Sequence, residues 1–252
     1  MGGLHERKVL LSWSSGKDCA LALHRLRQTD VGRVVGLLTT VNEMVARVSI
    51  HGVRLELLRA QADRLSLPLI EVPLPDPCSN EVYEERLGGA LDQAKRAGVS
   101  SVAFGDIHLQ DVREYRERQL AKVGLDAIFP IFGRPSAEVA REQIETGFRA
   151  LITCVDSRRL PACFAGREFD RRLLDQLPSD VDPCGEGGEF HTLVTWSPGF
   201  SRPIPVVLGA VVERGGFVYQ DVLLGPPGSG SSAAGAEIPR RAGPSGSKGG
   251  AD

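Results

Sequence analysis

The sequence predicts an α/β fold: a doubly wound, mainly parallel sheet with helices on both faces, followed by a smaller C-terminal α+β subdomain. Short apolar runs alternate with helical patterns of ten or more residues up to residue 155, as in strand–helix–strand units. After about residue 157, Gly and Pro become frequent, and three strand patterns follow one another without long helices. From residue 226, Gly, Pro and Ser dominate, and such a segment buries too little apolar surface to offset the entropy of ordering it.

These changes divide the chain into three predicted parts. We expect the larger domain at 6–157, the smaller subdomain at 158–225 and a disordered tail at 226–252. A chain of 252 residues is long enough for a sizeable core. In a parallel sheet, ligands bind beyond the carboxyl ends of the strands, so the functional site is expected there.

The first half of the chain supplies strands that are short apolar runs and helices with one apolar face. The run at 8–13 is followed directly by a turn, which indicates a buried strand. The next helix begins at Asp18, and its apolar residues from Ala20 to Leu26 recur at helical spacing. Further along, Asn80 or Ser79 is expected to cap the longest helix. The predicted elements are strands at 8–13, 34–41, 68–74 and 99–105, and helices at 18–26, 53–65 and 80–97.

The second half of the chain first continues this alternation and then changes to strands alone. A highly charged helix is expected at 111–123, and a sixth strand at 150–155 ends the alternating pattern. Between them lie a predicted strand at 127–132 and a helix at 136–146. The strands predicted after the change of pattern are antiparallel and lie at 190–196, 205–212 and 216–224.

Composition excludes several classes of protein and names no activity. With 30 Lys and Arg against 32 Asp and Glu, the net charge is -2, which argues against a nucleic-acid partner. No apolar run approaches the ~20 residues of a membrane span, and no secretory signal is visible at the N-terminus. The five cysteines are scattered without a CxxC pair, which favours a reduced, cytoplasmic protein.

The strongest local signal is the loop Ser-Trp-Ser-Ser-Gly-Lys-Asp-Cys at 12–19, between the first strand and the first helix. A loop in that place directs backbone N–H groups and the positive end of a helix at a phosphate. Gly16 permits close approach, the serine hydroxyls can donate hydrogen bonds, and Lys17 supplies positive charge. Asp18 could cap the helix or hold Mg²⁺ together with the phosphates. An ordinary polar turn would explain the Ser and Gly residues but not Lys beside Asp.

Residues 14–19 resemble the SGGKDS signature of the PP-loop ATP pyrophosphatases, which cleave ATP between its α- and β-phosphates. The rest of the chain narrows the resemblance to the diphthine–ammonia ligase family. Residues 185–192, Gly-Glu-Gly-Gly-Glu-Phe-His-Thr, are similar to that family's GEGGEYET signature. The other matching segments are His51, Gly105-Asp106, the run at 129–134 and the run at 147–153.

The resemblance implies a Rossmann-like fold of the PP-loop type, with an ATP-binding domain at 6–157 and a substrate-side subdomain at 158–225. It also implies an AMP-forming ligase, in which a carboxylate attacks the α-phosphate of ATP and ammonia then displaces AMP from the acyl-adenylate. ATP, ammonia and an unidentified carboxylate, on a small molecule or a protein, would be the substrates and Mg²⁺ the cofactor. The residues expected to bind the nucleotide are Ser12, Trp13, Ser14, Ser15, Gly16, Lys17, Asp18, Thr39, His51, Gly105 and Asp106.

The remaining expected site residues lie mostly in the glycine-rich segment. Glu186 and Glu189 flank two glycines, so both carboxylates could face one pocket, although a hairpin turn with two solvated acids is the alternative. Arg134 could bind a phosphate bidentately or form a surface ion pair, and Asp106 could contact a ligand or cap a helix. The expected catalytic residues are Lys17, Asp18, Glu186, Glu189 and His191, and the expected substrate-binding residues are Arg134, Gly187, Gly188 and Thr192.

Three residues depart from the family signatures. Ser15 stands where the signature has its second Gly, which is tolerable only if its φ is negative. Cys19 replaces a Ser and is expected to be a small buried helix residue. His191 replaces a Glu, which changes charge and proton chemistry at pH 7, so a different carboxylate substrate is expected. This variant resembles a mainly bacterial branch of the family, for which corrinoid side chains are one suggested substrate.

Two other classes of function stay open at this point. One is another PP-loop reaction, either tRNA modification, against which the balanced charge argues, or amidation of a corrinoid side chain. The other is a non-catalytic protein that binds ATP or AMP. A zinc site is not expected, because no two Cys or His residues share a short metal-ligand spacing. A homo-oligomer is left open.

Overall fold

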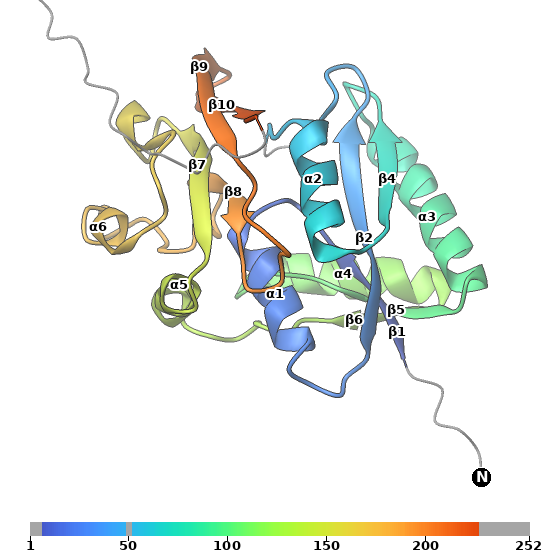
Figure 1. Ribbon diagram of the computed structural model, residues 1–252. Helices are drawn as coiled ribbons and strands as arrows, with labels where there is room; N and C mark the ends of the chain where they lie inside the picture. Colours follow the sequence, from blue (N-terminus) through green and yellow to red (C-terminus); the bar gives the residue numbers. More distant parts are fainter. Residues whose placement is uncertain (1–6, 49–51, 227–252) are drawn as a thin grey trace, which may run out of the picture.

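The computed structural model describes residues 7–48 and 52–226, which form two sheets lying side by side (Figure 1). The first sheet has the strand order β3-β2-β1-β5-β6, and β4 also pairs with β2. All its pairings are parallel except that of β3 with β2. Its strands are β1 (Lys8–Ser12), β2 (Arg33–Asn42), β3 (Arg47–Val48), β4 (Leu69–Leu74), β5 (Val99–Ala103) and β6 (Asp126–Ile128).

Helices cover both faces of this sheet, which confirms the doubly wound prediction. Alternate residues of β1 point to opposite faces: Val9 and Leu11 join the cluster under α1 and α2, and Leu10 joins the cluster under α3 and α4. In α3, Ser79 is the N-cap and its hydroxyl accepts a hydrogen bond from Val82 N, as predicted. The four helices are α1 (Lys17–Leu26), α2 (Leu55–Leu65), α3 (Asn80–Arg96) and α4 (Gln110–Val123).

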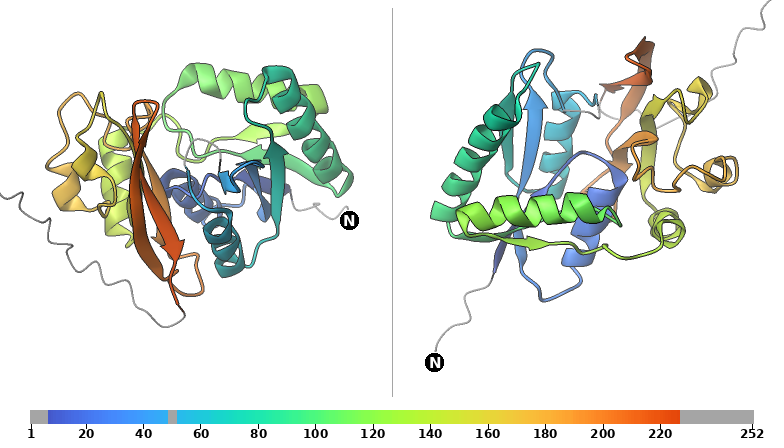
Figure 2. Two further views of the ribbon diagram at one scale, coloured as in Figure 1. Left: turned by 90° about the horizontal axis from the view of Figure 1, so that it is seen from above. Right: turned by 180° about the vertical axis from the view of Figure 1, so that it is seen from behind.

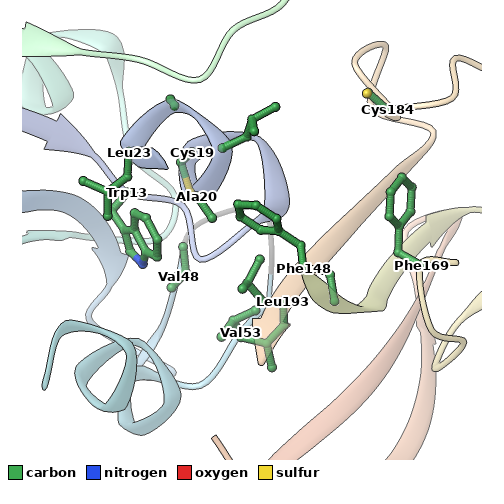
Figure 3. Packing of buried hydrophobic residues seen from close by; sticks show 14 of the residues in the cluster. Trp13, Cys19, Ala20, Leu23, Val48, Val53, Phe148, Phe169, Cys184 and Leu193 are labelled. Atoms are coloured by element: carbon green, nitrogen blue, oxygen red, sulfur yellow. The ribbon is translucent and has the colours of Figure 1, made fainter. Parts of the chain in front are cut away.

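The second sheet is antiparallel, with the strand order β8-β7-β10-β9. Seen from above, it stands beside the parallel sheet, with α5 on its far side (Figure 2). Its apolar core is continuous with that under α1, and Figure 3 shows Phe148 and Leu193 close to Cys19 and Ala20 of that helix. The elements are α5 (Ser136–Glu145), β7 (Arg149–Asp156), η1 (Ala162–Phe164), α6 (Arg171–Leu174), β8 (Phe190–Trp196), β9 (Val206–Arg214) and β10 (Phe217–Leu224).

The strand predicted at 150–155 exists as β7, but it does not extend the parallel sheet. It pairs antiparallel with β8 and β10, strands whose paired residues lie 35 or more positions later in the sequence. A local apolar pattern identifies a strand without identifying its partner, which is why the assignment to the first sheet was wrong. A domain boundary at residue 157 would separate β7 from its own sheet, so we propose a boundary between β6 and α5 instead.

Two smaller expectations also need correction. The strand predicted at 127–132 ends at Ile128, because the chain then turns and Gly133 N donates a hydrogen bond to Ile107 O. Asp18 does not cap α1: the N-cap is Gly16, and no side chain caps it. His51 and nearly all of the predicted tail lie outside the described residues. Within the described ranges, no helix has the length and apolarity to cross a membrane.

Candidate active site

The phosphate loop follows β1 and is held against β8 of the second sheet. Val194 N donates a hydrogen bond of 2.9 Å to Ser15 O, and Lys17 N donates one of 3.1 Å to the Thr192 hydroxyl. A Cβ added to Gly16 would lie 3.4 Å from that hydroxyl, so the loop and strand are in close contact. The second sheet therefore fixes the loop from which α1 begins.

The buried side chain of Gln61, on α2, also links the phosphate loop to β8. Its amide nitrogen donates to Ser15 O at 3.0 Å and to Val194 O at 2.7 Å. Its amide oxygen accepts from the indole nitrogen of Trp13 at 2.8 Å. Gln61 is wholly buried, so these three hydrogen bonds satisfy an amide that would otherwise be costly inside the core.

Ser15 adopts a φ of +73°. The expectation that a serine is tolerated at this position only with a negative φ is therefore wrong. The left-handed conformation that the signature's glycine favours is therefore present here with a serine side chain, at a cost of about 1 kcal/mol. The residue is fully buried, and its hydroxyl has no hydrogen-bond partner among the described residues. Its carbonyl, held by Gln61 and Val194, keeps the loop in this conformation.

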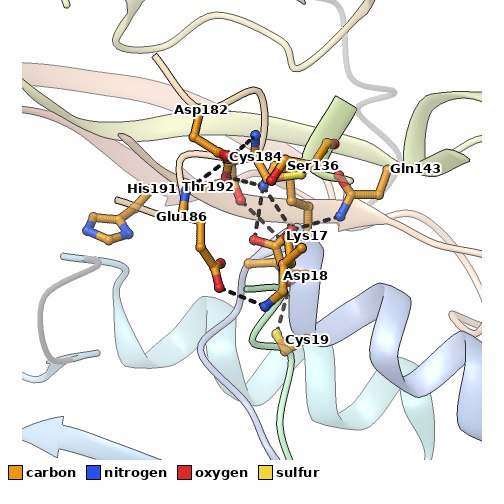
Figure 4. Close-up of polar contacts among 12 residues, drawn as sticks. Lys17, Asp18, Cys19, Ser136, Gln143, Asp182, Cys184, Glu186, His191 and Thr192 are labelled. Carbon is orange, nitrogen blue, oxygen red and sulfur yellow. Dashed lines mark hydrogen bonds and ion pairs between the residues drawn. The ribbon is translucent and has the colours of Figure 1, made fainter. Parts of the chain in front are cut away.

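Lys17 is almost fully buried at the centre of the site (Figure 4). Its ammonium donates to both oxygens of Asp18 at 2.9 Å and to Cys184 O at 2.5 Å. It also lies over the rings of Phe169 and Phe190, 5.1 and 5.5 Å from their centres. Burial lowers the pKa of Lys17, but the charge of Asp18, its hydrogen bond to the ammonium and the nearby Cys184 and Glu186 together outweigh burial, so the pKa is raised. Lys17 is therefore a fixed, charged ammonium at neutral pH.

The carboxylate of Asp18 links α1 to α5. One of its oxygens accepts a hydrogen bond of 2.8 Å from the amide of Gln143, which is itself wholly buried. Among the described residues, no group of three or more His, Cys, Asp or Glu side chains is arranged to hold a metal ion. A cation at Asp18 would therefore need ligands beyond these side chains, such as phosphate oxygens.

The glycine-rich segment forms a compact loop in which both glutamates turn inward. Glu186 Oε1 accepts from Ile107 N at 2.7 Å and from His108 N at 3.3 Å, so this carboxylate binds the loop that follows β5. Burial raises the pKa of Glu186, and the negative charges of Asp18 and Asp106 add to the rise. Solvated carboxylates, the alternative reading of this segment, do not fit that geometry.

Glu189 stabilises the loop itself. Its Oε1 accepts from Asp182 N at 3.2 Å, while its Oε2 is buried without a hydrogen-bond partner among the described residues. Asp182 in turn accepts from Cys184 N at 2.7 Å and Glu186 N at 3.3 Å. The glutamates thus make different contacts, Glu186 with the first sheet's loops and Glu189 within its own segment.

A cavity of about 660 Å³ lies at the carboxyl ends of β1, β2, β4 and β5, where ligands of parallel sheets bind. Ser12, Trp13 and Ser14 form the side next to the phosphate loop, and Thr39 lies beside them with its hydroxyl donating to Trp13 O. The rest of the lining is mostly apolar and aromatic, with Arg116 and Gln119 among the polar groups. The apolar lining residues include Leu38, Leu74, Leu91, Val102 and Phe104.

The loop after β5 packs tightly against the start of α1. A Cβ on Gly105 would lie 2.7 Å from Cys19 N, so only glycine fits. Asp106 caps no helix but forms an ion pair of 2.7 Å with Arg116, whose guanidinium stacks 4.3 Å from the Phe104 ring centre. Asp106 thereby positions an arginine that lines the cavity.

Two predicted site residues lie away from the cluster around Lys17. Arg134 forms an ion pair with Glu142, which Arg25 also contacts. Figure 4 shows the ring of His191 pointing away from Lys17 and Asp18. Burial, together with the positive charge of Lys17, lowers the pKa of His191 to about 4. His191 is therefore neutral at pH 7.

The site residues predicted from the sequence did not include Gln61, Gln143, Asp182 and Cys184. The two glutamines carried a signal, because each lies beside apolar residues on the buried face of its predicted helix, where an amide needs hydrogen-bond partners. Asp182 and Cys184 carried none, since they act in a loop whose shape depends on contacts with α1 and the loop after β5. Cys19 is buried in α1 as expected, and burial raises the pKa of its thiol to about 11.

Comparison with known proteins gives matches along most of the chain. The family model of the diphthamide synthase N-terminal domain matches residues 7–127, and that of the C-terminal domain matches residues 136–217. No curated protein matches the chain. One similar solved structure is described as a predicted subunit of tRNA methyltransferase from Methanocaldococcus jannaschii. It is 14% identical, with 76% of this chain and 98% of that chain covered and a TM-score of 0.40.

Proposed function

The chain belongs to the diphthamide synthase family, and from this premise we propose a reaction for it. We propose that it is an ATP-dependent ligase that forms an amide from a carboxylate and ammonia. AMP and pyrophosphate would be the other products. Family membership supports the use of ATP by a PP-loop enzyme. The observation that carries the proposal is the position of the α1 N-terminus, between the 660 Å³ cavity and the loop that bears Glu186.

The nucleoside of ATP would occupy the cavity at the carboxyl ends of the strands. Its volume and its apolar walls suit a purine and a ribose, and Ser12 and Ser14 bring the phosphate loop to its edge. The phosphates would then extend over Gly16 toward the N-terminus of α1, where the helix dipole favours negative charge. The hydroxyl of Ser15 has no partner among the described residues and would donate to them once the phosphates displace the groups that bury it.

Lys17 would neutralise the negative charge that develops as the bond between the α- and β-phosphates breaks. Its ammonium is held by Asp18 and Cys184 O, so Lys17 would act through its fixed positive charge. Mg²⁺ would be held by Asp18 together with phosphate oxygens, and would supply further neutralising charge there.

Glu186 is our candidate for the proton transfer in the second half of the reaction. Ammonia attacks the acyl carbon of the adenylate, the bond to AMP breaks, and the attacking nitrogen must lose a proton. A carboxylate with a raised pKa is suited to accept that proton near neutral pH. The hydrogen bonds from Ile107 N and His108 N hold it in place beside the loop after β5.

His191 bears on which carboxylate substrate the enzyme uses. A neutral imidazole stands where the family signature has a carboxylate, so one negative charge is removed from that side of the site. A substrate that carries a positive charge would lose a favourable interaction there. We therefore propose that the carboxylate differs from diphthine.

The test follows nitrogen from ammonium into an amide. The protein, ATP and Mg²⁺ are incubated with ¹⁵N-ammonium and either a small-molecule extract or a total-protein extract, and mass spectrometry detects ¹⁵N amides. We expect ATP-dependent incorporation by the wild type and by the control Lys122→Met, an exposed lysine on α4. Lys17→Met should reduce it about 100-fold or more. Incorporation without ATP, or unchanged incorporation by Lys17→Met, would contradict the proposal.

A further inference from the structure

The edge strand of the antiparallel sheet, β9, exposes an unusually apolar surface. It is the last strand in the order β8-β7-β10-β9, and in the described part of the chain it pairs with β10 alone. Four of its side chains are large, apolar and about half exposed: Val207, Leu208, Val211 and Val212. Neighbouring residues of a strand point to opposite faces, so both faces of the sheet are open at this edge.

Most of this edge lacks charge and proline, two of the features by which monomeric proteins prevent strand pairing. The charged residues of β9 are its last two, Glu213 and Arg214. Residues 206–212 contain no charged residue and no proline, and Figure 1 shows β9 at the margin of the molecule. The ladder with β10 does have one irregularity, where Gly209 and Ala210 together lie opposite Asp221. An exposed apolar edge of this length is expected to be covered by another strand.

The irregularity gives β9 a two-fold symmetric pattern. Val211 lies opposite Gln220 and Leu208 opposite Val222, positions on one face of β10, so Leu208 and Val211 share a face. By the same register, Val207 and Val212 lie opposite Leu223 and Tyr219 and share the other face. On each side of the Gly209–Ala210 bond, the strand therefore has first a small residue and then two large apolar residues that point to opposite faces.

We propose that β9 pairs antiparallel with β9 of a second copy of this chain, about a two-fold axis at the Gly209–Ala210 bond. Leu208 of one copy would then face Val211 of the other on one side of the joined sheet. Val207 would face Val212 on the other side. These pairs match in size and face, and a two-fold interface requires such self-complementarity. The two four-stranded sheets become one continuous sheet.

The chain's own C-terminal segment is a poorer occupant of this edge. Residues 227–252 contain one large apolar side chain, Ile238, among Gly, Pro, Ala, Ser and charged residues. Such a segment cannot cover four half-exposed valine and leucine side chains on two faces. A second β9 supplies all four.

The test is a charge exchange across the proposed axis, read out by sedimentation equilibrium of the full chain. The wild type should sediment at twice 27.1 kDa at micromolar concentration. Leu208→Glu and Val211→Lys should each weaken dimerisation about 100-fold, because each buries charges without partners. The double variant should recover most of that loss, because each introduced glutamate then faces an introduced lysine of the other copy.

Val31→Lys is the matched control, since Val31 is also a half-exposed valine but lies in the turn before β2. It should leave the dimer intact, and thermal unfolding should confirm that all variants fold. A wild type that sediments at the mass of one chain would overturn the proposal. So would a dimer that tolerates Val211→Lys as well as Val31→Lys. A double variant no tighter than the single ones would refute the register.

Discussion

Ser15 and His191 are the residues at which this chain departs most from the signatures it otherwise follows, and each has a physical consequence. Ser15 holds a backbone conformation suited to glycine, with a buried hydroxyl that has no partner among the described residues. His191 brings an imidazole, kept neutral by burial, to a position of a carboxylate. Ser15 is expected to cost stability at any pH, and His191 only in acid, and both effects can be measured.

Replacing Ser15 by glycine should stabilise the protein. Ser15→Gly removes the strain of a serine at φ +73° and a buried hydroxyl without a partner, so the free energy of unfolding should rise by about 1 kcal/mol. Ser14→Gly is the control, because Ser14 has no such φ, and it should be neutral or destabilising. Urea unfolding measures both. If Ser15→Gly also weakens ATP binding, the hydroxyl contributes to the phosphate site.

The low pKa of His191 predicts a loss of stability in mild acid. The unfolded chain takes up a proton near pH 6.5, whereas the folded protein does so only near pH 4. Stability from this group is therefore complete above pH 6.5 and is lost as the pH falls toward 4, by about 2 kcal/mol at pH 5.

His191→Gln removes this titration. The difference in unfolding free energy between wild type and variant should therefore shrink or reverse between pH 7.5 and pH 5. A difference that stays constant over this range would show that His191 is not held neutral by the fold.

At the scale of the elements, the site depends on how closely three segments approach the N-terminus of α1. These are the loop after β5, strand β8 and the glycine-rich loop. Gly105 contacts the backbone of Cys19, Thr192 accepts from Lys17 N, and Cys184 O accepts from the ammonium of Lys17. A change at any of these contacts is expected to move the helix end relative to the cavity.

Gly105→Ala tests this packing. Its Cβ would lie 2.7 Å from Cys19 N, so the helix end must shift. We expect a loss of about 1–3 kcal/mol, the typical cost of overpacking a core, together with loss of ATP binding. Gly88→Ala is the control, because Gly88 lies within α3 with no atom within 4 Å of an added Cβ. That variant should gain about 0.5–1 kcal/mol from helix propensity. Equal stability of the two variants would show that α1 is not confined as described.

The sequence was sufficient to predict the longer elements but not the short β3, η1 and α6, and it predicted only part of the site. Apolar runs and helical spacing located the strands and helices, because those patterns are local. The pairing of β7 with β8 and β10 is not local, so no pattern in 150–155 revealed it. In the same way, the Ser-Gly-Lys loop was visible in one segment, whereas the contacts of Lys17 with Cys184 O and of Glu186 with Ile107 N join residues far apart in the chain.

At the scale of the whole molecule, the parallel sheet and the antiparallel sheet contribute different parts of one site. The first supplies the cavity and the phosphate loop, and the second supplies Thr192, Cys184 and Glu186 around the same helix end. β9 forms the edge of the antiparallel sheet opposite β8, and β8 is the strand that contacts the phosphate loop, so the two proposals rest on different strands of this sheet.

The proposed ligase reaction requires ATP to be cleaved between its α- and β-phosphates. The decisive measurement incubates the protein with ATP labelled in the α-phosphate, together with Mg²⁺, ammonium and a carboxylate-containing extract, and separates the labelled nucleotides. The label should accumulate in AMP with an equal amount of pyrophosphate, and Lys17→Met should abolish this. Label accumulating in ADP would contradict the proposed reaction.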